Sequence, residues 1–153
     1  MPTNCCKIIL SDHQSRCTEK QRIIVSKDER HDYKHIGYNN SQGRVRHYKI
    51  DGDVLPKGKS PERCDFMLLT DDTNPPTAYL IELKGSPADG DKCIAQVANT
   101  EKMCKESLRG YQIMYRFVFG NGHGIYSSKY ISWRDKLPKG KLQYNRNIVE
   151  DKF

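Results

Sequence analysis

Continuous apolar runs in the middle of the chain give the clearest pattern. Residues 66–69 and 78–81 are apolar throughout, and the turn-forming segment 71–76 separates them. Runs of this length without alternation are typical of strands that are covered on both faces. Residues 111–119 form a third, mostly apolar run that is interrupted at Arg116, and they predict a third strand of the same core.

The segment between the second and third runs has helical periodicity. Over residues 89–108, side chains that suit a buried face recur at intervals of three or four positions. They are Cys93, Val97, Thr100, Cys104 and Leu108. This spacing predicts a helix of about five turns packed on the sheet. Strand, strand, helix and strand in this order indicate the α/β class.

The N-terminal part of the chain has weaker patterns. Residues 7–10 and 22–25 predict short strands. The charged stretch 26–35 predicts a helix, with Ser26 as its N-cap and Glu29 at the capping-box position.

Residues 45–50 predict a firmer strand, because Val45, Tyr48 and Ile50 follow one another in a short segment. This strand is expected to turn at residues 51–53 and to continue through residues 54 and 55 as a hairpin.

The chain has the length of a single domain. Its 153 residues contain no repeat and no composition typical of a linker between domains. We expect one domain with its core at about residues 45–119 and a basic C-terminal segment at residues 120–153.

Charge is distributed unevenly around a formal net charge of +7. Residues 64–128 are net acidic, whereas residues 129–153 carry a basic excess. Basic flanks around an acidic middle suit a protein that attracts a polyanion and keeps carboxylates for a cation. A solubility charge without any partner is the alternative.

Targeting and redox patterns exclude several classes. No apolar run approaches the roughly 20 residues of a membrane-spanning helix, and no secretion signal is visible, so we expect a cytoplasmic protein with no membrane partner.

The six cysteines are therefore expected to be free thiols, and none of them forms a Cys-x-x-Cys pair. His31 and His35 could share a helical face, but further zinc ligands at recognisable spacing are missing.

Charged residues at two predicted strand ends form the candidate site. Asp65 precedes the first central strand and Glu82-Leu83-Lys84 closes the next, so the three charges meet if the strands pair as a hairpin. Glu82 and Lys84 then share one face, and Leu83 faces the other. A divalent cation such as Mg²⁺ would relieve the repulsion between the two carboxylates. A structural salt bridge at the sheet edge is the alternative.

These residues resemble the PD-(D/E)XK nuclease superfamily. The resemblance covers about residues 45–119 and rests on residues 63–69, residues 79–85 and the helix that carries Gln96. It implies a restriction-endonuclease-like fold, in which a mixed β-sheet is flanked by helices.

The resemblance also implies roles for single residues. Asp65 and Glu82 would hold Mg²⁺, or Mn²⁺ in its place, and the carbonyl of Leu83 would add a ligand. Lys84 would position or activate the attacking water, and Gln96 resembles a glutamine that some members use. The alternative for Gln96 is a solvent-facing helix residue.

The sequence departs from the family pattern at two positions. Cys64 stands where the eponymous motif has proline, and Thr100 stands where some subgroups have a tyrosine. The family also commonly has an acidic residue on an N-terminal helix, for which Glu29 is the candidate and Glu19 the substitute.

Asp51 and Asp53 are further acidic candidates. Because Asp-Gly-Asp is common turn chemistry, we favour a turn for these two residues.

The C-terminal segment interleaves aromatic and basic residues. Lys129, Trp133, Arg134 and Lys136 suit phosphate contact and base stacking. A core position for Trp133 with a solvated basic rim is an equal alternative. The glycine-rich loop that contains His123 lacks the Lys-Ser or Lys-Thr of a P-loop.

Together these patterns predict a metal-dependent nuclease that hydrolyses phosphodiester bonds and is a DNA endonuclease rather than an RNA-cleaving enzyme. An RNA-cleaving toxin-type nuclease and a non-catalytic nucleic-acid-binding module on the same fold are the alternatives. A homodimer would suit a junction-resolving version of the nuclease.

Overall fold

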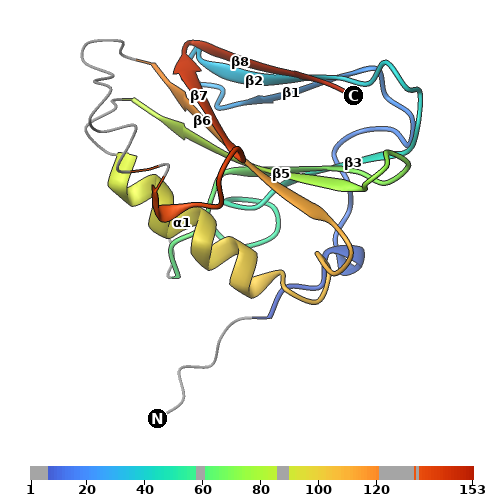
Figure 1. Cartoon of the computed structure of the whole chain (residues 1–153), viewed down its shortest axis with the longest axis horizontal. Coiled ribbons are helices and arrows are strands. Elements are labelled where there is room, and N and C mark those ends of the chain that lie inside the picture. Colours follow the sequence, from blue (N-terminus) through green and yellow to red (C-terminus); the bar gives the residue numbers. More distant parts are fainter. Residues whose placement is uncertain (1–6, 58–60, 86–89, 121–132, 134) are drawn as a thin grey trace.

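A five-stranded mixed sheet forms the centre of the computed structural model, which describes residues 7–57, 61–85, 90–120, 133 and 135–153 (Figure 1). Its strands in spatial order are β3 (Val45–Lys49), β4 (Phe66–Thr70), β5 (Thr77–Lys84), β6 (Gln112–Phe119) and β7 (Leu142–Arg146). The predicted α/β class and the mixed sheet are confirmed.

The connections within this sheet follow from the lengths of the links. β4 and β5 pair antiparallel, because a short turn connects them. β3 also pairs antiparallel to β4. The chain then crosses over through α1 (Gly90–Met103), and β6 pairs parallel to β5 and β7 parallel to β6. The three strands predicted from apolar runs are therefore present as β4, β5 and β6, and the hairpin between the first two is confirmed.

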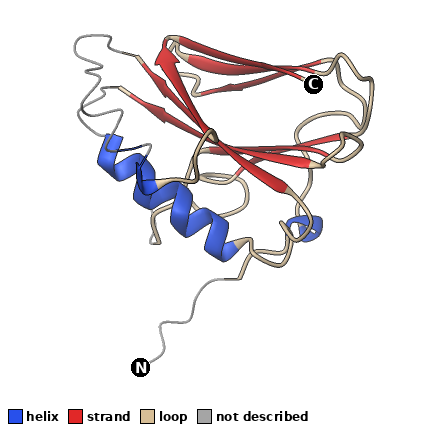
Figure 2. Ribbon diagram, in the orientation of Figure 1, coloured by secondary structure: helices blue, strands red, loops and turns tan. Residues whose placement is uncertain are grey.

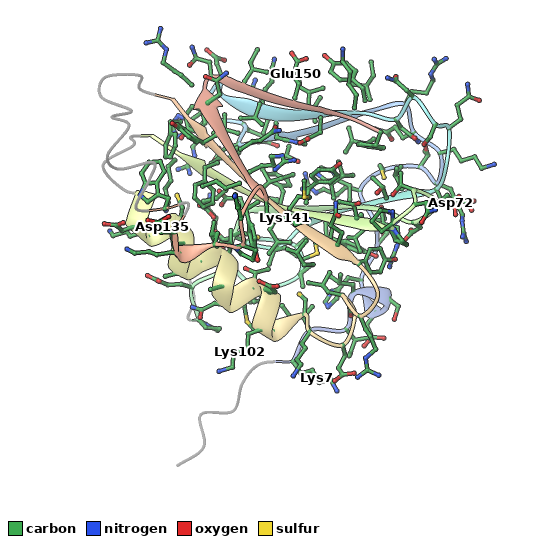
Figure 3. All side chains as sticks on the ribbon, viewed as in Figure 1. Lys7, Asp72, Lys102, Asp135, Lys141 and Glu150 are labelled. Carbon is green, nitrogen blue, oxygen red and sulfur yellow. The ribbon has the colours of Figure 1, made fainter. Side chains whose placement is uncertain are left out.

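A second sheet covers the face of the five-stranded sheet that α1 leaves open (Figure 2). It contains β1 (Ile23–Lys27), β2 (Lys34–Tyr38) and β8 (Ile148–Lys152) in the order β1-β2-β8. Glu150 of β8 points outward from this layer (Figure 3). In the described part of the chain a helix thus covers one face of the mixed sheet, and a sheet covers the face where a second helix was expected.

Two separate cores result from this layering. The first core lies between α1 and the five-stranded sheet and includes Val97, Leu80 and Phe117. The second lies between the two sheets and includes Ile81 and Val118. Residues next to each other in β5 and β6 therefore enter different cores, which explains why both strands are apolar on both faces.

The helix predicted at residues 26–35 is wrong. This stretch is the end of β1, a turn and the start of β2, which pair antiparallel. The pattern misled because the side chains that β1 and β2 bury here are polar: the Ser26 hydroxyl lies 2.8 Å from Nε2 of His47, and His35 is fully buried. His31 and His35 therefore share no helical face.

Other boundaries also differ from the predictions. Residues 7–10 form no strand; they lead into a short 3-10 helix, η1 (Leu10–Asp12). The long helix ends at Met103 rather than at residue 108, and turns follow it. β3 ends at Lys49 and pairs with β4, so residues 51–55 form a turn with one bridge and do not continue the strand as a hairpin.

A buried cluster of charged and polar groups joins the two sheets. Arg116 of β6 donates from Nε and Nη2 to the two oxygens of Asp151 in β8, at 2.7 and 2.9 Å. His35 of β2 lies 2.8 Å from the same carboxylate, and the Arg116 guanidinium stacks over the ring of Tyr79, 5.2 Å from its centre. These contacts dock β2 and β8 onto the five-stranded sheet.

The cysteines of the described residues form no disulfide. Cys17, Cys64, Cys93 and Cys104 carry free thiols. Within the residues that the structure describes, no helix is both long enough and apolar enough to cross a membrane.

Candidate active site

The pairing of β4 with β5 brings the two acidic residues of the motif together. Phe66 pairs with Ile81, so Asp65, one residue earlier, lies beside Glu82, one residue later. The main-chain N–H of Leu83 donates a hydrogen bond of 2.8 Å to Oδ2 of Asp65. This bond fixes the Asp65 carboxylate at the end of β5.

Lys84 completes the cluster from the same strand. Its Nζ lies 3.6 Å from Oε1 of Glu82, whose residue is only 1 % exposed. Alternation along β5 places Glu82 and Lys84 on the α1 side, whereas Leu83 enters the core between the sheets. The convergence predicted for Asp65, Glu82 and Lys84 is present.

Burial strongly perturbs both carboxyl groups. The pKa of Glu82 is raised well above its usual value, first by burial and then by the nearby charge of Asp65. Burial also raises the pKa of Asp65. A side-chain hydrogen bond with Asp65 raises the pKa of Glu82 further, whereas the charge of Lys84 lowers it, and on balance the cluster favours a proton on Glu82.

One oxygen atom of Glu82 and one on the neighbouring helix lack hydrogen-bond donors. Among the residues that the structure describes, Oε2 of Glu82 and Oε1 of Gln96 are buried without a partner. Gln96 lies on α1, which packs against β5, and its buried Oε1 does not fit a solvent-facing side chain. Buried acceptors without donors are costly, and a hard cation or a water held by one would satisfy them.

The donor set fits Mg²⁺ or Mn²⁺ better than a metal that needs many protein ligands. Within the described ranges, no group of three or more His, Cys, Asp or Glu side chains could hold a metal. Mg²⁺ is commonly bound through one or two carboxylates and keeps several waters. Asp65 and Glu82 would supply the carboxylates, with the Leu83 carbonyl as an additional oxygen.

Thr100 supports the site through hydrogen bonds. The sequence predicted that it faces the core but did not predict these contacts. Its hydroxyl donates to the carbonyl of Gln96 and accepts from the N–H of Cys64, both at 2.8 Å, and the side chain is fully buried. It ties the helical turn that carries Gln96 to the residue before Asp65. A threonine within an otherwise apolar helical stripe was the available signal, because a buried hydroxyl needs partners.

The structure supports neither acidic candidate from the N-terminal region. Glu29 is exposed in the turn between β1 and β2, and no contact among the described residues joins it to Asp65 or Glu82. The carbonyl of Glu19 accepts a hydrogen bond from Val45, at the opposite end of the five-stranded sheet. The helix on which such an acid was expected is a hairpin.

Asp51 and Asp53 lie in ion pairs with arginines. Asp51 is 2.9 Å from Nη2 of the buried Arg63, and Asp53 is 2.6 Å from Nε of Arg16. These contacts agree with the turn that the sequence favoured for both residues.

Trp133 belongs to the core and not to a nucleic-acid surface. It is 1 % exposed and packs against the rings of Phe119 and Tyr144. Gly90 begins α1 directly beneath it, where a Cβ atom would lie 1.9 Å from the indole ring. Stacking of a base on Trp133 is therefore wrong, and the alternative core position is correct.

Few of the predicted phosphate-binding cations can be placed. Lys136 is exposed, and its Nζ lies 3.6 Å from Asp91 at the start of α1. Arg146, another cation of the basic C-terminal segment, is exposed at the end of β7. It is aligned across the sheet with Phe119 of β6 and Lys84 of β5. Lys129, Arg134 and His123 lie outside the described residues.

Comparisons with known proteins add no family to this picture. No protein-family model, no curated protein and no solved structure matches the chain. The interpretation of the Asp65–Glu82–Lys84 cluster therefore rests on the residues and their geometry.

Proposed function

We propose that this protein is a metal-dependent nuclease that hydrolyses phosphodiester bonds, with DNA as the preferred substrate. The observation that carries the proposal is the buried pair of carboxylates, Asp65 and Glu82. Lys84 lies beside Oε1 of Glu82, and Oε2 of Glu82 has no hydrogen-bond donor among the described residues. Such a site is suited to a divalent cation, and a cation at a sheet edge can meet a phosphate.

The connectivity around the site supports the proposal. Asp65 precedes β4, Glu82 and Lys84 end β5, and α1 then leads to the parallel strand β6. This is the order of strands, helix and charged residues on which the resemblance to the PD-(D/E)XK superfamily rests.

The residues of the chain divide the chemistry among them. A bound divalent cation supplies a Lewis acid and lowers the pKa of water. Asp65, whose carboxylate accepts a hydrogen bond from the Leu83 N–H, and Glu82 would hold this cation. The ammonium of Lys84 orients the attacking water and offsets charge that develops on the phosphoryl oxygens. Gln96, on the helix that packs against β5, would offer its buried Oε1 as a further acceptor.

The surroundings favour an anionic polymer as substrate. The chain has a formal net charge of +7, and Arg146 stands exposed in the same row as Lys84. Exposed cations near such a site attract phosphates. The free thiols suit a reducing, cytoplasmic compartment. A homodimer stays a prediction, which a measurement of the mass in solution would test.

Cleavage assays test the proposal directly. The purified protein is incubated with plasmid DNA, single-stranded DNA and total RNA, each with Mg²⁺, Mn²⁺ or EDTA. We expect metal-dependent cutting of DNA that is lost in Asp65→Ala, Glu82→Ala and Lys84→Ala. Lys105→Ala, which changes an exposed lysine beyond α1, should keep full activity and serves as the matched control.

The other outcomes select among the alternatives. Cutting of RNA alone would replace DNA by RNA as the substrate. Salt-sensitive binding without turnover would indicate a non-catalytic module. Activity that survives both Asp65→Ala and Glu82→Ala would overturn the assignment of this site.

A further inference from the structure

Two aromatic rings stack in the turn between β1 and β2. The ring centres of His31 and Tyr33 are 5.0 Å apart, and the ring planes differ by 21°. His31 is exposed and Tyr33 is half-buried. The pair therefore offers an aromatic surface at the outside of the molecule, in a stretch that the sequence pattern suggested was a helix.

This ring pair lies at the same sheet edge as the candidate active site. The Tyr33 ring packs on Gly120, and the N–H of Gly120 donates a 2.9 Å hydrogen bond to the carbonyl of Lys84. The pKa of Tyr33 is raised by burial first and also by the charge of Asp65, while Lys84 opposes this effect. Contacts and charges thus agree that Tyr33 adjoins the cluster.

Packing holds the Tyr33 ring in place. A Cβ atom at Gly120 would lie 2.3 Å from the ring, so the absence of a side chain there lets the ring approach the backbone. Tyr33 also packs against the core between the two sheets. An aromatic ring that is already fixed loses little conformational entropy when a ligand stacks on it.

Charges in the same turn are largely paired within it. Lys27 lies 3.9 Å from Asp32, and Arg30 lies 3.2 Å from Asp28. The turn therefore has little net charge with which to attract a phosphate. Its distinctive feature is the aromatic surface, which suits the face of a base.

We propose that the His31–Tyr33 pair is a binding site for an unpaired nucleobase beside the phosphate that Asp65, Glu82 and Lys84 act on. Both faces of a base inside a duplex are covered by its neighbours, so only an unstacked base can lie on a protein ring. The preferred substrate is therefore single-stranded DNA, or DNA with an unpaired segment at the scissile bond. The identity of that phosphate rests on the proposed nuclease function.

Binding measurements without metal isolate this site from catalysis. Fluorescence anisotropy in EDTA follows three probes: a labelled oligothymidylate, an abasic oligomer of the same length, and a duplex. The variants are Tyr33→Leu, which removes the ring, Tyr33→Phe, which keeps it, and His31→Ala at an exposed position. Tyr38→Leu is the matched control, because Tyr38 is a half-buried tyrosine at the other end of β2.

The expected effects differ between probes and variants. Tyr33→Leu and His31→Ala each weaken binding of the oligothymidylate about fivefold or more, the usual size of a lost base–aromatic stack. Tyr33→Phe and Tyr38→Leu bind as the unchanged protein does, and binding of the abasic oligomer is the same in all variants. The unchanged protein prefers the single strand to the duplex.

Several results would overturn the stacking site. They are unchanged affinity in Tyr33→Leu and His31→Ala, an equal loss with the abasic oligomer, a preference for the duplex, and no binding of any single strand. Cleavage assays report separately on the nuclease. Base-dependent binding without cleavage would support the stacking site and contradict the proposed function. Cleavage by a protein whose Tyr33→Leu and His31→Ala variants bind single strands normally would support the function and contradict the stacking site.

Discussion

Two buried charged clusters of this protein solve the same electrostatic problem differently. Asp151 between the two sheets receives hydrogen bonds on both oxygens, from Arg116 and from the His35 ring. Glu82 at the sheet edge has one oxygen near Lys84 and one that no donor among the described residues reaches. One carboxylate is satisfied and the other is not.

The pKa values of the two carboxylates move in opposite directions. Burial alone would raise the pKa of Asp151, but the hydrogen bonds from His35 and Arg116 outweigh burial and lower it. Burial and the neighbouring Asp65 together raise the pKa of Glu82 well above its usual value. In the Asp151 cluster the group without a partner is a nitrogen, Nδ1 of His35, and not a carboxylate oxygen.

The difference separates a structural ion pair from a candidate site. A buried charge alone indicates neither, because both clusters are buried. What distinguishes them is whether the protein supplies the partners that each carboxylate needs. Asp151 has its partners, whereas Oε2 of Glu82 has none among the described residues, and it is there that we propose a cation from solution.

Removing each carboxylate should affect stability very differently. Asp151→Asn leaves the buried Arg116 without its counter-charge and should lower the free energy of unfolding by about 3–5 kcal/mol. Glu82→Gln removes a charge that burial already disfavours. It should change the free energy of unfolding by no more than about 1 kcal/mol. Urea unfolding of both variants checks this. Equal destabilisation would show that the Glu82 cluster is a structural ion pair as well.

His47 adds a third buried group, whose effect depends on pH. Burial first, and then the charge of Arg16, lower the pKa of His47 to about 4. Between pH 6.5 and 4 the unfolded chain binds a proton that the folded chain rejects, so stability is lost as the pH falls. The loss should be roughly 3 kcal/mol across this range.

The His47→Gln variant isolates this contribution from the carboxylates. The difference between the unfolding free energies of the unchanged protein and His47→Gln should depend on pH between 6.5 and 4 and be flat above pH 7. A difference that is flat throughout would mean that His47 takes up its proton in the folded state.

Removing the Thr100 hydroxyl should destabilise the protein less than removing the Asp151 carboxylate. Thr100→Val keeps the shape of the side chain but leaves the buried N–H of Cys64 unsatisfied, at a cost of about 1–3 kcal/mol. Thr100→Ser keeps the hydroxyl and should restore the hydrogen bond. Unfolding and cleavage are measured on both variants. If Thr100→Ser and Thr100→Val lose equal activity, the hydroxyl does not position Asp65.

The centre of the fold was predictable because its strands are apolar on both faces. Buried residues in β4 and β5 form uninterrupted runs, and the turn between them places Asp65 beside Glu82. The candidate site could therefore be derived from two strand ends and their hairpin.

In the second sheet only the start of β1 was predicted, by the strand expected at residues 22–25, whereas β2 and β8 were not. β1 and β2 bury polar side chains such as Ser26 and His35, whose partners come from distant parts of the chain. β8 buries Val149, half-buries Asp151 and exposes Ile148, Glu150 and Lys152, so it contains no apolar run that would mark a strand. Tertiary hydrogen bonds stabilise these strands, and no local pattern reports them.

The Asp65–Glu82 site and its cation can be tested by titrating Mn²⁺ into the protein by calorimetry. We predict saturable binding to the unchanged protein that is at least about tenfold weaker in Glu82→Gln, the loss of one charged ligand. Asp72→Asn, whose carboxylate pairs with Arg44 at the opposite end of β3 and β4, should bind Mn²⁺ like the unchanged protein. No binding, or equal binding by the unchanged protein and Glu82→Gln, would contradict a metal centre at this sheet edge.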